Sequence, residues 1–424
     1  MKYFGTDGIR GIVGEKLNEQ LIKKLGKALV RFYKTHNLPA NLIVGNDTRQ
    51  SSDYILAVLQ TILLTGGIEV HNIGICSSPC LAFLTRKHRF PLGLMISASH
   101  NPKEYNGLKF FNINGEKVAD SFEQEIETYM DKPYKLPATN FATSKNAFNL
   151  KADYVSMLKS LKKVEYPCIL DCASGGSSEI ARQVFGSTKI INANPNGENI
   201  NVNAGCTHIE ELATLCQQKG LIGFAFDGDA DRVMAVDKTG TVLDGDKILY
   251  ILSKFYLKSG QSVVGTINTN SGLTEAISKH NLNLVRASVG DKRVYEQMLK
   301  HHSMLGGEES GHIIIKKYTN TGDGILTAIC LMNILHLTGL NFADLLTGYT
   351  EFATAKQNIK LTKPFSTTQD IKLLIDKYTS DNARIVIRPS GTEPVLRLLV
   401  EHKDKKTATQ MLERLVYNIK LQQQ

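Results

Sequence analysis

The sequence predicts an α/β protein with largely parallel sheets that ends in a smaller α+β domain. Over most of the 424 residues, short apolar runs alternate with segments of helical periodicity, which is typical of strand–helix units in parallel sheets. Near the C-terminus the pattern changes, because two short apolar runs flank a loop containing Pro and Gly and a helical segment follows. Two strands joined by a short loop pair antiparallel, so this last part is expected to form a domain of its own.

The first helix is expected at residues 18–33, where Leu21, Leu25 and Leu29 fall on one stripe. A second helix is expected at residues 52–64. Apolar runs predict strands at residues 42–45, 68–73, 92–96, 168–171, 221–226, 263–267 and 284–288. The C-terminal domain is expected to contain strands at residues 384–387 and 395–400 and a helix at residues 405–421.

A chain of this length accommodates two to four domains of ordinary size, about 100–200 residues each, and we expect four. The candidate boundaries are three polar or turn-rich stretches at residues 133–149, 237–240 and 347–364. The expected domains therefore span residues 1–145, 146–238, 239–350 and 351–424.

The composition is that of a globular protein, with 42% apolar and 21% charged residues, and it argues against disorder. The formal net charge of +9 favours an anionic partner, which could be nucleic acid, an acidic membrane surface or a phosphorylated metabolite. The chain has no Trp and no interleaving of basic and aromatic residues, which argues against nucleic acid.

The seven Cys residues are odd in number and form no C-x-x-C pair, which indicates buried, reduced thiols and a cytoplasmic location. The N-terminal segment lacks the apolar core of a signal sequence. The most apolar stretch, residues 325–340, is interrupted by polar side chains, so it predicts a buried helix rather than a membrane span. We therefore expect no membrane partner.

The strongest chemical signal is the run DGDADR, which begins at Asp227 and follows a predicted strand. Open α/β sheets bind ligands at the carboxyl ends of their strands. Asp227, Asp229 and Asp231 alternate along the chain and can converge on one hard cation, with Mg²⁺ favoured for a site of few carboxylates. A calcium EF-hand is excluded because its sixth and twelfth positions would be Arg232 and Lys238. The alternative is a solvated acidic turn.

The run SASHNP, at residues 97–102, follows the strand expected at residues 92–96. A serine at this carboxyl end, Ser99, can carry a phosphoryl group. The G-x-S-x-G elbow of a serine hydrolase is absent. Lys109 follows closely in the sequence and could approach the same site, although the run alone is equally typical of a polar turn.

The C-terminal loop RPSGTEP, at residues 388–394, has Arg397 three residues beyond it. Its hydroxyls, the N–H groups around Gly391 and two guanidiniums make a candidate phosphate site, because a guanidinium can bond two phosphate oxygens at once. The alternative is a hairpin turn with surface Arg side chains.

Two further runs are weaker signals. In GGEESGH, at residues 306–312, Glu308 and Ser310 could bond sugar hydroxyls, or the run could be a charged loop. FGTDGIRG, at residues 4–11, places three glycines beside Arg10 and suggests a loop close to an anion. Neither the dinucleotide-binding G-x-G-x-x-G pattern nor a P-loop is present.

SASHNP, DGDADR, GEESGH and RPSGTEP, in this order, resemble the motifs of the α-D-phosphohexomutase superfamily over essentially the whole chain. Within that superfamily, FGTDGIRG and residues 194–212 are similar to the bacterial phosphoglucosamine mutases. Residues 204–208, Ala-Gly-Cys-Thr-His, depart from the more usual Cys-Gly-Ser-Thr-His. The resemblance implies three similar α/β domains with mixed, largely parallel sheets plus a C-terminal α+β domain, arranged around a central cleft.

The resemblance also implies roles for the residues that match these motifs. Mg²⁺ would be held by Ser99, Asp227, Asp229 and Asp231, with Arg232 beside the metal loop. The catalytic centre would comprise the phosphoserine Ser99 with Arg10, His100, Lys109 and His312, of which Arg10 and Lys109 would transfer protons or stabilise charge. The substrate would be bound by Glu308 and Ser310 at the sugar and by Arg388, Ser390, Gly391, Thr392 and Arg397 at the unreactive phosphate.

By the same resemblance, the chain is expected to interconvert glucosamine 6-phosphate and glucosamine 1-phosphate through a hexose 1,6-bisphosphate that serves as intermediate and activator. This reaction would supply UDP-N-acetylglucosamine and cell-wall synthesis. The alternatives are phosphomannomutase or phosphoglucomutase activity, a metal-dependent phosphatase, and a basic nucleic-acid-binding protein. The expected partner is a small sugar phosphate, not nucleic acid or a membrane, and a homodimer is a further expectation.

Overall fold

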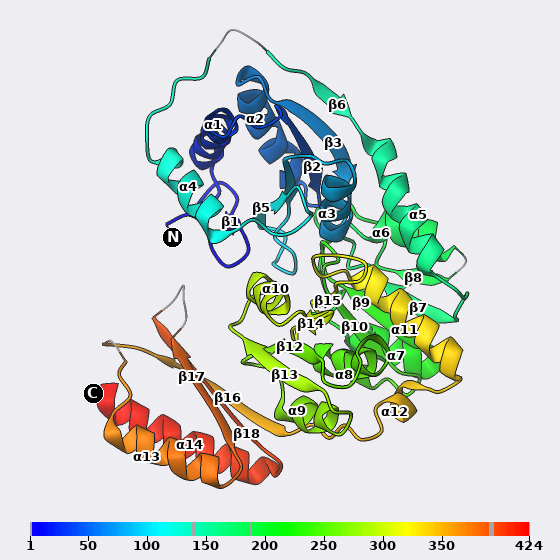
Figure 1. Ribbon diagram of the computed structural model, residues 1–424, viewed down its shortest axis with the longest axis vertical. Helices are drawn as coiled ribbons and strands as arrows, with labels where there is room; N and C mark the ends of the chain where they lie inside the picture. The colour runs from blue at the N-terminus through cyan, green and yellow to red at the C-terminus, as the bar shows by residue number, and fades with distance from the viewer. Residues whose placement is uncertain (1, 138–140, 187, 364, 390–393, 424) are drawn as a thin grey trace.

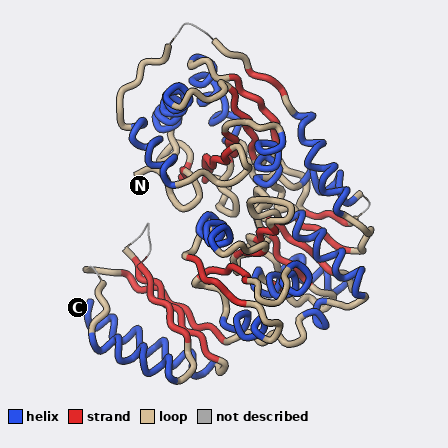
Figure 2. The backbone as a smooth tube through the Cα atoms, viewed as in Figure 1, coloured by secondary structure: helices blue, strands red, loops and turns tan. Residues whose placement is uncertain are grey.

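The computed structural model forms four sheets (Figure 1) and describes residues 2–137, 141–186, 188–363, 365–389 and 394–423. Helices lie along the faces of the sheets (Figure 2). Three predicted phosphate-binding residues, Ser390, Gly391 and Thr392, lie outside the described residues.

The first sheet has six strands in the order β1-β5-β4-β2-β3-β6. Strands β4, β2, β3 and β6 are parallel, and β5 pairs antiparallel with both β4 and β1. The strands are β1 (Ile9–Ile12), β2 (Asn41–Asn46), β3 (Glu69–Ile75), β4 (Leu92–Ile96), β5 (Tyr105–Asn112) and β6 (Ser144–Asn146). The helices are α1 (Glu19–Thr35), α2 (Ser51–Thr65), α3 (Ser78–Lys87) and α4 (Asp120–Met130).

Strand β2 explains why the inner strands read as unbroken apolar runs. Successive side chains of a strand point to opposite faces of the sheet. Leu42 and Val44 accordingly pack into one core cluster and Ile43 packs into another, and all three are fully buried. A parallel strand covered on both faces needs apolar residues at every position.

The second sheet has the order β11-β10-β9-β7-β8. Strands β9, β7 and β8 are parallel, whereas β10 pairs antiparallel with β9 and β11. The strands are β7 (Cys168–Asp171), β8 (Lys189–Ile191), β9 (Ile222–Phe226), β10 (Val233–Val236) and β11 (Val242–Leu243). The helices of this region are α5 (Lys151–Leu161), α6 (Ser178–Phe185) and α7 (Glu210–Lys219), and the short 3₁₀ helix η1 (Phe148–Leu150) precedes α5.

The third sheet has the order β13-β12-β14-β15, with only the last pair antiparallel. Its strands are β12 (Ser262–Thr266), β13 (Asn283–Ala287), β14 (Leu305–Gly307) and β15 (Ile313–Ile315). The helices are α8 (Gly245–Tyr256), α9 (Ser271–Ser278), α10 (Asp291–Lys300), α11 (Gly324–Thr338) and α12 (Phe342–Leu345).

The fourth sheet is antiparallel throughout, in the order β16-β18-β17, and α13 and α14 lie on one of its faces (Figure 1). Its elements are β16 (Ala353–Lys360), α13 (Gln369–Ser380), β17 (Arg384–Pro389), β18 (Val395–His402) and α14 (Lys405–Gln423). This C-terminal unit has its own apolar core, which includes Ile371, Leu398 and Leu415. In contrast, one core cluster runs continuously through the regions of the first three sheets.

The first three sheets share one feature that positions the site. In each sheet, one of the motifs lies in the loop that joins a parallel strand to the antiparallel strand beside it. The β4–β5 loop carries Ser99, the β9–β10 loop carries the three aspartates and the β14–β15 loop carries Glu308, Ser310 and His312. The three α/β regions are therefore similar in the way that they present chemistry.

The strands and helices expected from periodicity are confirmed, with ends displaced by one or two residues. The apolar stretch near residue 330 is the buried helix α11, and the seven Cys residues are free and buried. Among the described residues, no helix combines the length and hydropathy that crossing a membrane requires. The domain boundaries stay predictions. The one at residue 145 falls within β6, and the one at residue 238 falls in the turn that joins β10 to β11.

Asp323 caps the N-terminus of α11 and provides a test of how pH affects stability. Its carboxylate accepts hydrogen bonds from the Leu326 N–H at 2.9 Å and from the Tyr154 hydroxyl at 2.8 Å. Burial raises the pKa of Asp323 to about 6, although these hydrogen bonds act in the opposite direction. A carboxyl with a raised folded-state pKa stabilises the fold fully below the unfolded-state pKa of about 4, and this stabilisation is lost as pH rises through about 6.

We therefore expect Asp323→Asn to flatten the pH dependence of stability. Between pH 4 and pH 7, the free energy of unfolding of the parent should fall by up to about 3 kcal/mol relative to that of the variant. Urea unfolding at several pH values measures this difference, and Asp344→Asn on the exposed side of α12 controls for the exchange of carboxyl for amide. Identical pH profiles for the parent and Asp323→Asn would contradict the assignment.

Candidate active site

Ser99 lies in the β4–β5 loop with only 1% of its surface exposed. Its hydroxyl donates a hydrogen bond to Asp227 of the second sheet, and its Oγ lies 3.4 Å from Nδ1 of His100. The backbone φ of Ser99 is 54°, a left-handed conformation that non-glycine residues seldom adopt. Such a conformation persists where the surroundings fix it, and it frequently marks an active site.

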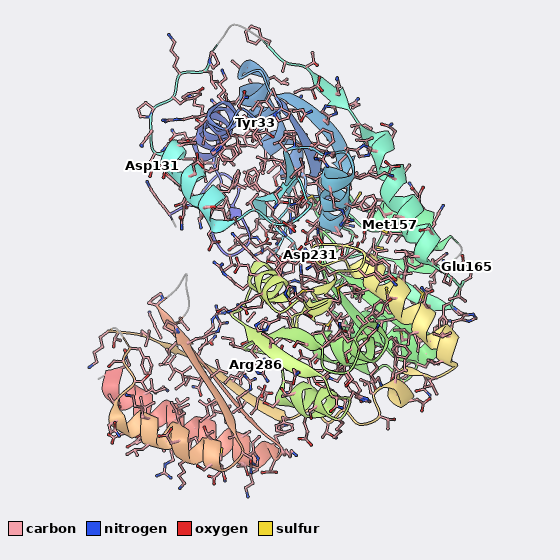
Figure 3. All side chains as sticks on the ribbon, viewed as in Figure 1. Tyr33, Asp131, Met157, Glu165, Asp231 and Arg286 are labelled. Carbon is pink, nitrogen blue, oxygen red and sulfur yellow. The ribbon has the colours of Figure 1, made fainter. Side chains whose placement is uncertain are left out.

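The three predicted metal ligands converge in the β9–β10 loop. Carboxylate oxygens of Asp227, Asp229 and Asp231 all lie within 4.8 Å of one another, and the three side chains are buried. Asp231 lies near the middle of the molecule, where the first and second sheets approach each other (Figure 3). The intervening Gly228 is required by this approach, because a Cβ there would lie 2.6 Å from the Ser99 carbonyl oxygen.

The electrostatics of these aspartates fit a divalent cation. Burial, followed by the charges of Asp231 and Asp229, raises the pKa of Asp227 to about 8. The Oδ1 atoms of Asp229 and Asp231 are buried and accept no hydrogen bond from the described residues. Buried carboxylate oxygens without partners are costly unless a cation compensates them, and all-oxygen sites suit Mg²⁺.

Lys109 extends from β5 into the same cluster, with 1% of its surface exposed. Its Nζ lies 2.8 Å from Asp229, 2.9 Å from Asp7 and 3.7 Å from Asp231. Burial lowers the pKa of Lys109, but these three carboxylates outweigh burial and raise the pKa above its usual value. The side chain is therefore a fixed cation at neutral pH, with its charge directed at the aspartate cluster.

Three other predicted catalytic residues border the cluster. Arg10 pairs with Asp7 and donates to Asn101 Oδ1 at 3.0 Å. Burial, followed by the positive charges of Arg232 and Arg10, lowers the pKa of His100 to about 4, so this ring is neutral at pH 7.

His312 is the third of these residues, and it is 2% exposed. Its Nε2 accepts a hydrogen bond from the Gly322 N–H at 3.0 Å, and its Nδ1 lies 3.7 Å from Asp231. Burial lowers the pKa of His312, but the charge of Asp231 and the contact with it outweigh burial and raise the pKa above its usual value.

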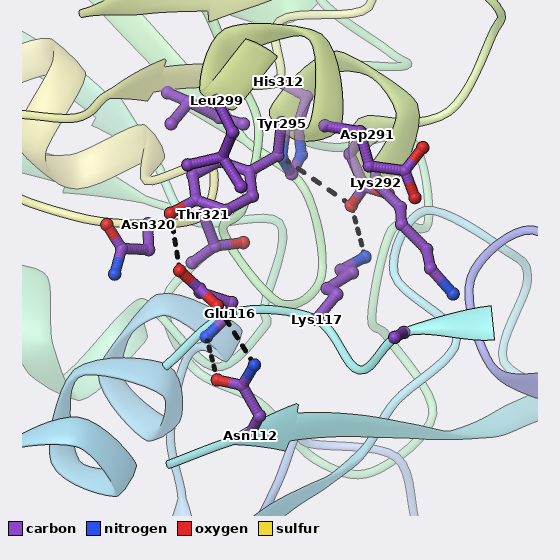
Figure 4. Close-up of a pocket in the computed structure, with 13 residues that line it drawn as sticks. Asn112, Glu116, Lys117, Asp291, Lys292, Tyr295, Leu299, His312, Asn320 and Thr321 are labelled. Carbon is purple, nitrogen blue, oxygen red and sulfur yellow. Dashed lines mark hydrogen bonds and ion pairs between the residues drawn. The ribbon is translucent and has the colours of Figure 1, made fainter. Parts of the chain in front are cut away.

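His312 and Lys117 also line a pocket of about 180 Å³ between the first and third sheets (Figure 4). Within it, Lys117 pairs with Asp291 of α10, and the Tyr295 hydroxyl donates to Glu116 Oε1 at 2.8 Å. These contacts join the segment between β5 and α4 to α10, so they fix the third sheet region against the first.

The predicted sugar-binding residues lie in the β14–β15 loop. Glu308 is 8% exposed, and its Oε1 accepts a hydrogen bond from the Gly290 N–H at 2.9 Å. Ser310 is half-buried in the same loop. The loop adjoins the end of the β9–β10 loop, because Val233 N–H donates to the Gly311 carbonyl at 3.0 Å.

The predicted phosphate site lies on the C-terminal sheet. Arg388 of β17 is directly opposite Arg397 of β18 in the ladder. Burial and the charge of Arg397 lower the pKa of Arg388. Like charges placed opposite each other destabilise a sheet, so this pair is suited to an anion that neutralises both. Lys356 of β16 lies 3.5 Å from Glu309, which connects this sheet with the β14–β15 loop.

Comparison with known proteins identifies the family. Profiles described as "Phosphoglucomutase/phosphomannomutase, alpha/beta/alpha domain I", "alpha/beta/alpha domain III" and "C-terminal domain" match residues 1–136, 244–352 and 355–417. The chain is 40% identical to the phosphoglucosamine mutase of Thermoanaerobacter pseudethanolicus, over 98% of each chain. It is 36% identical to that of Bacillus subtilis, over 98% of this chain and 97% of that one. The chain belongs to the phosphoglucosamine mutase family.

Membership of the phosphoglucosamine mutases confirms the predicted superfamily and the predicted enzyme class, an isomerase. The fold also matches solved structures. A phosphoglucomutase/phosphomannomutase family protein from Burkholderia thailandensis superposes with a TM-score of 0.81 at 20% identity, over 99% of this chain and 97% of that one. An Aspergillus fumigatus N-acetylphosphoglucosamine mutase, crystallised with GlcNAc-6P and magnesium, has a TM-score of 0.65 at 17% identity, over 97% and 94% of the two chains.

Several residues of this phosphoglucosamine mutase site were not predicted from sequence. Asp7 lies in a run noted only for its glycines and Arg10, yet its carboxylate pairs with both Lys109 and Lys117. Arg49 follows a predicted strand, so the carboxyl-end rule could have identified it. Nothing in the local sequence of Lys117 or Asp291 indicates that they meet.

Proposed function

We propose that this enzyme interconverts glucosamine 6-phosphate and glucosamine 1-phosphate by passing a phosphoryl group through Ser99. The observation that carries the proposal is the contact between the Ser99 hydroxyl and Asp227 inside a buried cluster of carboxylates. A hydroxyl held there is shielded from water and lies beside the only groups of the β9–β10 loop suited to a hard cation. Phosphoryl transfer depends mainly on such positioning and on compensation of charge.

Mg²⁺ is the cation that we propose for this site, with Asp227, Asp229, Asp231 and an oxygen of Ser99 or its phosphate as ligands. When bound, Mg²⁺ would supply positive charge to a phosphoryl group during transfer. The chain's own residues would hold Asp229 in place: Lys109 pairs with its carboxylate, and the Ser78 N–H donates to its main-chain carbonyl at 2.9 Å.

The reaction requires two transfers. In the first, the bond between phosphorus and Ser99 Oγ breaks and a bond from phosphorus to O1 of glucosamine 6-phosphate forms. The O1 hydroxyl gives up its proton, and Ser99 Oγ takes up a proton to become the free hydroxyl. In the second, the bond between phosphorus and O6 of the 1,6-bisphosphate breaks and a bond to Ser99 Oγ forms. The Ser99 hydroxyl gives up its proton, O6 takes up a proton, and glucosamine 1-phosphate leaves.

We assign charge stabilisation, rather than proton transfer, to Lys109 and Arg10, because both form ion pairs with Asp7. His100 and His312 would line the reaction centre, since His100 lies beside Ser99 and His312 beside Asp231. Glu308 and Ser310 would bond sugar hydroxyls. Because the bisphosphate must present either phosphate to Ser99, the other phosphate needs a second anchor, and Arg388 and Arg397 with the RPSGTEP loop would provide it.

A panel of sugar phosphates tests the substrate. After priming with a hexose 1,6-bisphosphate, glucosamine 6-phosphate should be converted to its 1-phosphate faster than mannose 6-phosphate or glucose 6-phosphate under equal conditions. A preference for mannose or glucose would instead favour phosphomannomutase or phosphoglucomutase activity with the same chemistry. Release of free phosphate in excess of sugar 1-phosphate would favour a phosphatase.

Arg388 provides a separate test of the phosphate anchor. Arg388→Ala should raise the KM for glucosamine 6-phosphate by about 10- to 100-fold, since a hydrogen bond to a charged group contributes about 1.5–3 kcal/mol. Steady-state kinetics measure the change, and Arg414→Ala on the exposed face of α14 is the control. A KM within twofold of the parent value would remove Arg388 from substrate binding.

We also propose that the enzyme acts in the cytoplasm with a small sugar phosphate as its partner. The reduced, buried cysteines support this location. Formation of a homodimer stays a prediction.

A further inference from the structure

Arg49 is an almost fully buried arginine, 2% exposed, that follows β2 and lies beneath the β4–β5 loop. Its guanidinium donates hydrogen bonds to three main-chain carbonyls of that loop and to one at the start of β5. The acceptors are Ser99 at 2.9 Å, Asn101 at 2.8 Å, Tyr105 at 2.9 Å and Pro102. One side chain thus holds the backbone of the whole segment that presents Ser99.

Asp47 orients this guanidinium. Its carboxylate accepts hydrogen bonds from the Arg49 side chain and the Arg49 backbone N–H, each at 3.0 Å, and both side chains are fully buried. The same carboxylate accepts from the Ser97 hydroxyl at 2.6 Å, and that hydroxyl accepts from the Ser99 N–H at 2.9 Å. Asp47 and Arg49 together therefore reach both sides of the Ser99 backbone, its N–H through Ser97 and its carbonyl directly.

This arrangement accounts for the left-handed backbone of Ser99. A serine at φ 54° relaxes to an ordinary conformation unless its surroundings prevent it. The Ser99 carbonyl accepts a second hydrogen bond from Asn201 of the neighbouring sheet region, at 2.8 Å. The backbone is thus fixed from the first and the second sheet regions at once, with the hydroxyl directed at Asp227.

We propose that Arg49 is a positioning residue for phosphoryl transfer, which holds Ser99 in the conformation that directs its Oγ into the aspartate cluster. The proposal rests on the proposed function, in which Ser99 carries the phosphoryl group. Among the described residues, Arg49 has no contact with the three aspartates of the β9–β10 loop, with Glu308 or with the C-terminal arginines. It therefore acts on the reaction only through the loop that carries Ser99.

The role requires a guanidinium and not merely a positive charge. The planar fork of Arg presents five N–H donors in fixed directions, which lets it bond several carbonyls and Asp47 together. A Lys ammonium has three donors at one point and cannot span the same acceptors. Arg49→Lys therefore keeps the charge that pairs with Asp47 while loosening the loop.

Steady-state kinetics of Arg49→Lys test the proposal. Misplacement of a reacting atom by about 1 Å costs on the order of 100-fold in rate, so we expect kcat to fall by about 100-fold. The KM for glucosamine 6-phosphate should stay within about twofold, because the groups that bind the sugar and its phosphate are elsewhere. Arg86→Lys is the matched control, since the Arg86 guanidinium also donates to a distant backbone carbonyl, that of Tyr318 at 3.0 Å.

Ser97→Ala provides a second variant, which decides the question if Arg49→Lys does not fold. It removes the link between Asp47 and the Ser99 N–H with a much smaller change in volume, and kcat should fall by about tenfold without a change in KM. Circular dichroism and thermal unfolding identify the folded variants. If Arg49→Lys is folded, an unchanged kcat, or equal losses in kcat and substrate affinity, would overturn the proposal. If Arg49→Lys is unfolded, an unchanged kcat in Ser97→Ala would overturn it.

Ser99→Ala, assayed in parallel, separates this inference from the proposed function. If Ser99→Ala retains turnover, the proposed function fails whatever Arg49→Lys does. If Ser99→Ala is inactive and Arg49→Lys has normal kcat, only the positioning role of Arg49 fails.

Discussion

Ser99→Ala should reduce mutase turnover by about 10,000-fold or more, because no other hydroxyl takes the place of a covalent carrier. The side chain contributes a hydrogen bond to Asp227 and a longer contact, of 3.4 Å, with His100 Nδ1, and its removal should leave the fold intact. Sugar 1-phosphate formation after priming with hexose 1,6-bisphosphate measures the loss. Ser160→Ala, on the exposed surface of α5, is the control for the same truncation away from the site.

Mass analysis of the protein during turnover gives a second readout for Ser99. Phosphate should appear on the peptide that contains residues 96–100 in the parent enzyme and should be absent from Ser99→Ala. Near-normal turnover by the variant, or phosphate found only elsewhere on the parent chain, would contradict the phosphoserine mechanism.

Asp229→Asn should lower kcat by about 100- to 1,000-fold and raise the Mg²⁺ concentration needed for half-maximal rate. The substitution replaces a carboxylate whose Oδ1 is buried without a partner among the described residues, and it removes the charge that Lys109 faces at 2.8 Å. Both changes weaken the electrostatic compensation that phosphoryl transfer requires.

A Mg²⁺ titration distinguishes metal binding from general damage to the site. Asp237→Asn is the matched control, because Asp237 lies at the β10–β11 turn of the same sheet, where its carboxylate accepts hydrogen bonds from Thr239 and Thr241. If the parent and Asp229→Asn have the same Mg²⁺ dependence, the three aspartates do not hold the metal. If kcat falls but the Mg²⁺ titration is unchanged, Asp229 contributes to the reaction through its ion pair with Lys109 and not through metal binding.

The local motifs were the most predictable part of the site. The DGDADR and SASHNP runs each follow a strand, and the carboxyl end of a parallel strand is where a sheet places ligand-binding groups. Their chemistry could therefore be predicted from residue type and spacing. The structure brings Ser99 and Asp227 together across 128 positions of sequence. Resemblance to a family, and no local rule, predicted that meeting.

The sequence by itself determined the strands, the helices and the chemistry that each loop can perform, since periodicity and turn residues act over a few positions. Only the tertiary structure decided which distant groups meet. Lys109 pairs with Asp7, Lys117 pairs with Asp291, and Arg49 donates hydrogen bonds to the carbonyls of the Ser99 loop. A buried contact between segments far apart in the sequence leaves no periodic signal in either segment, because its energy depends on how the segments pack. The same packing holds Ser99 in its left-handed conformation, which no property of serine would predict.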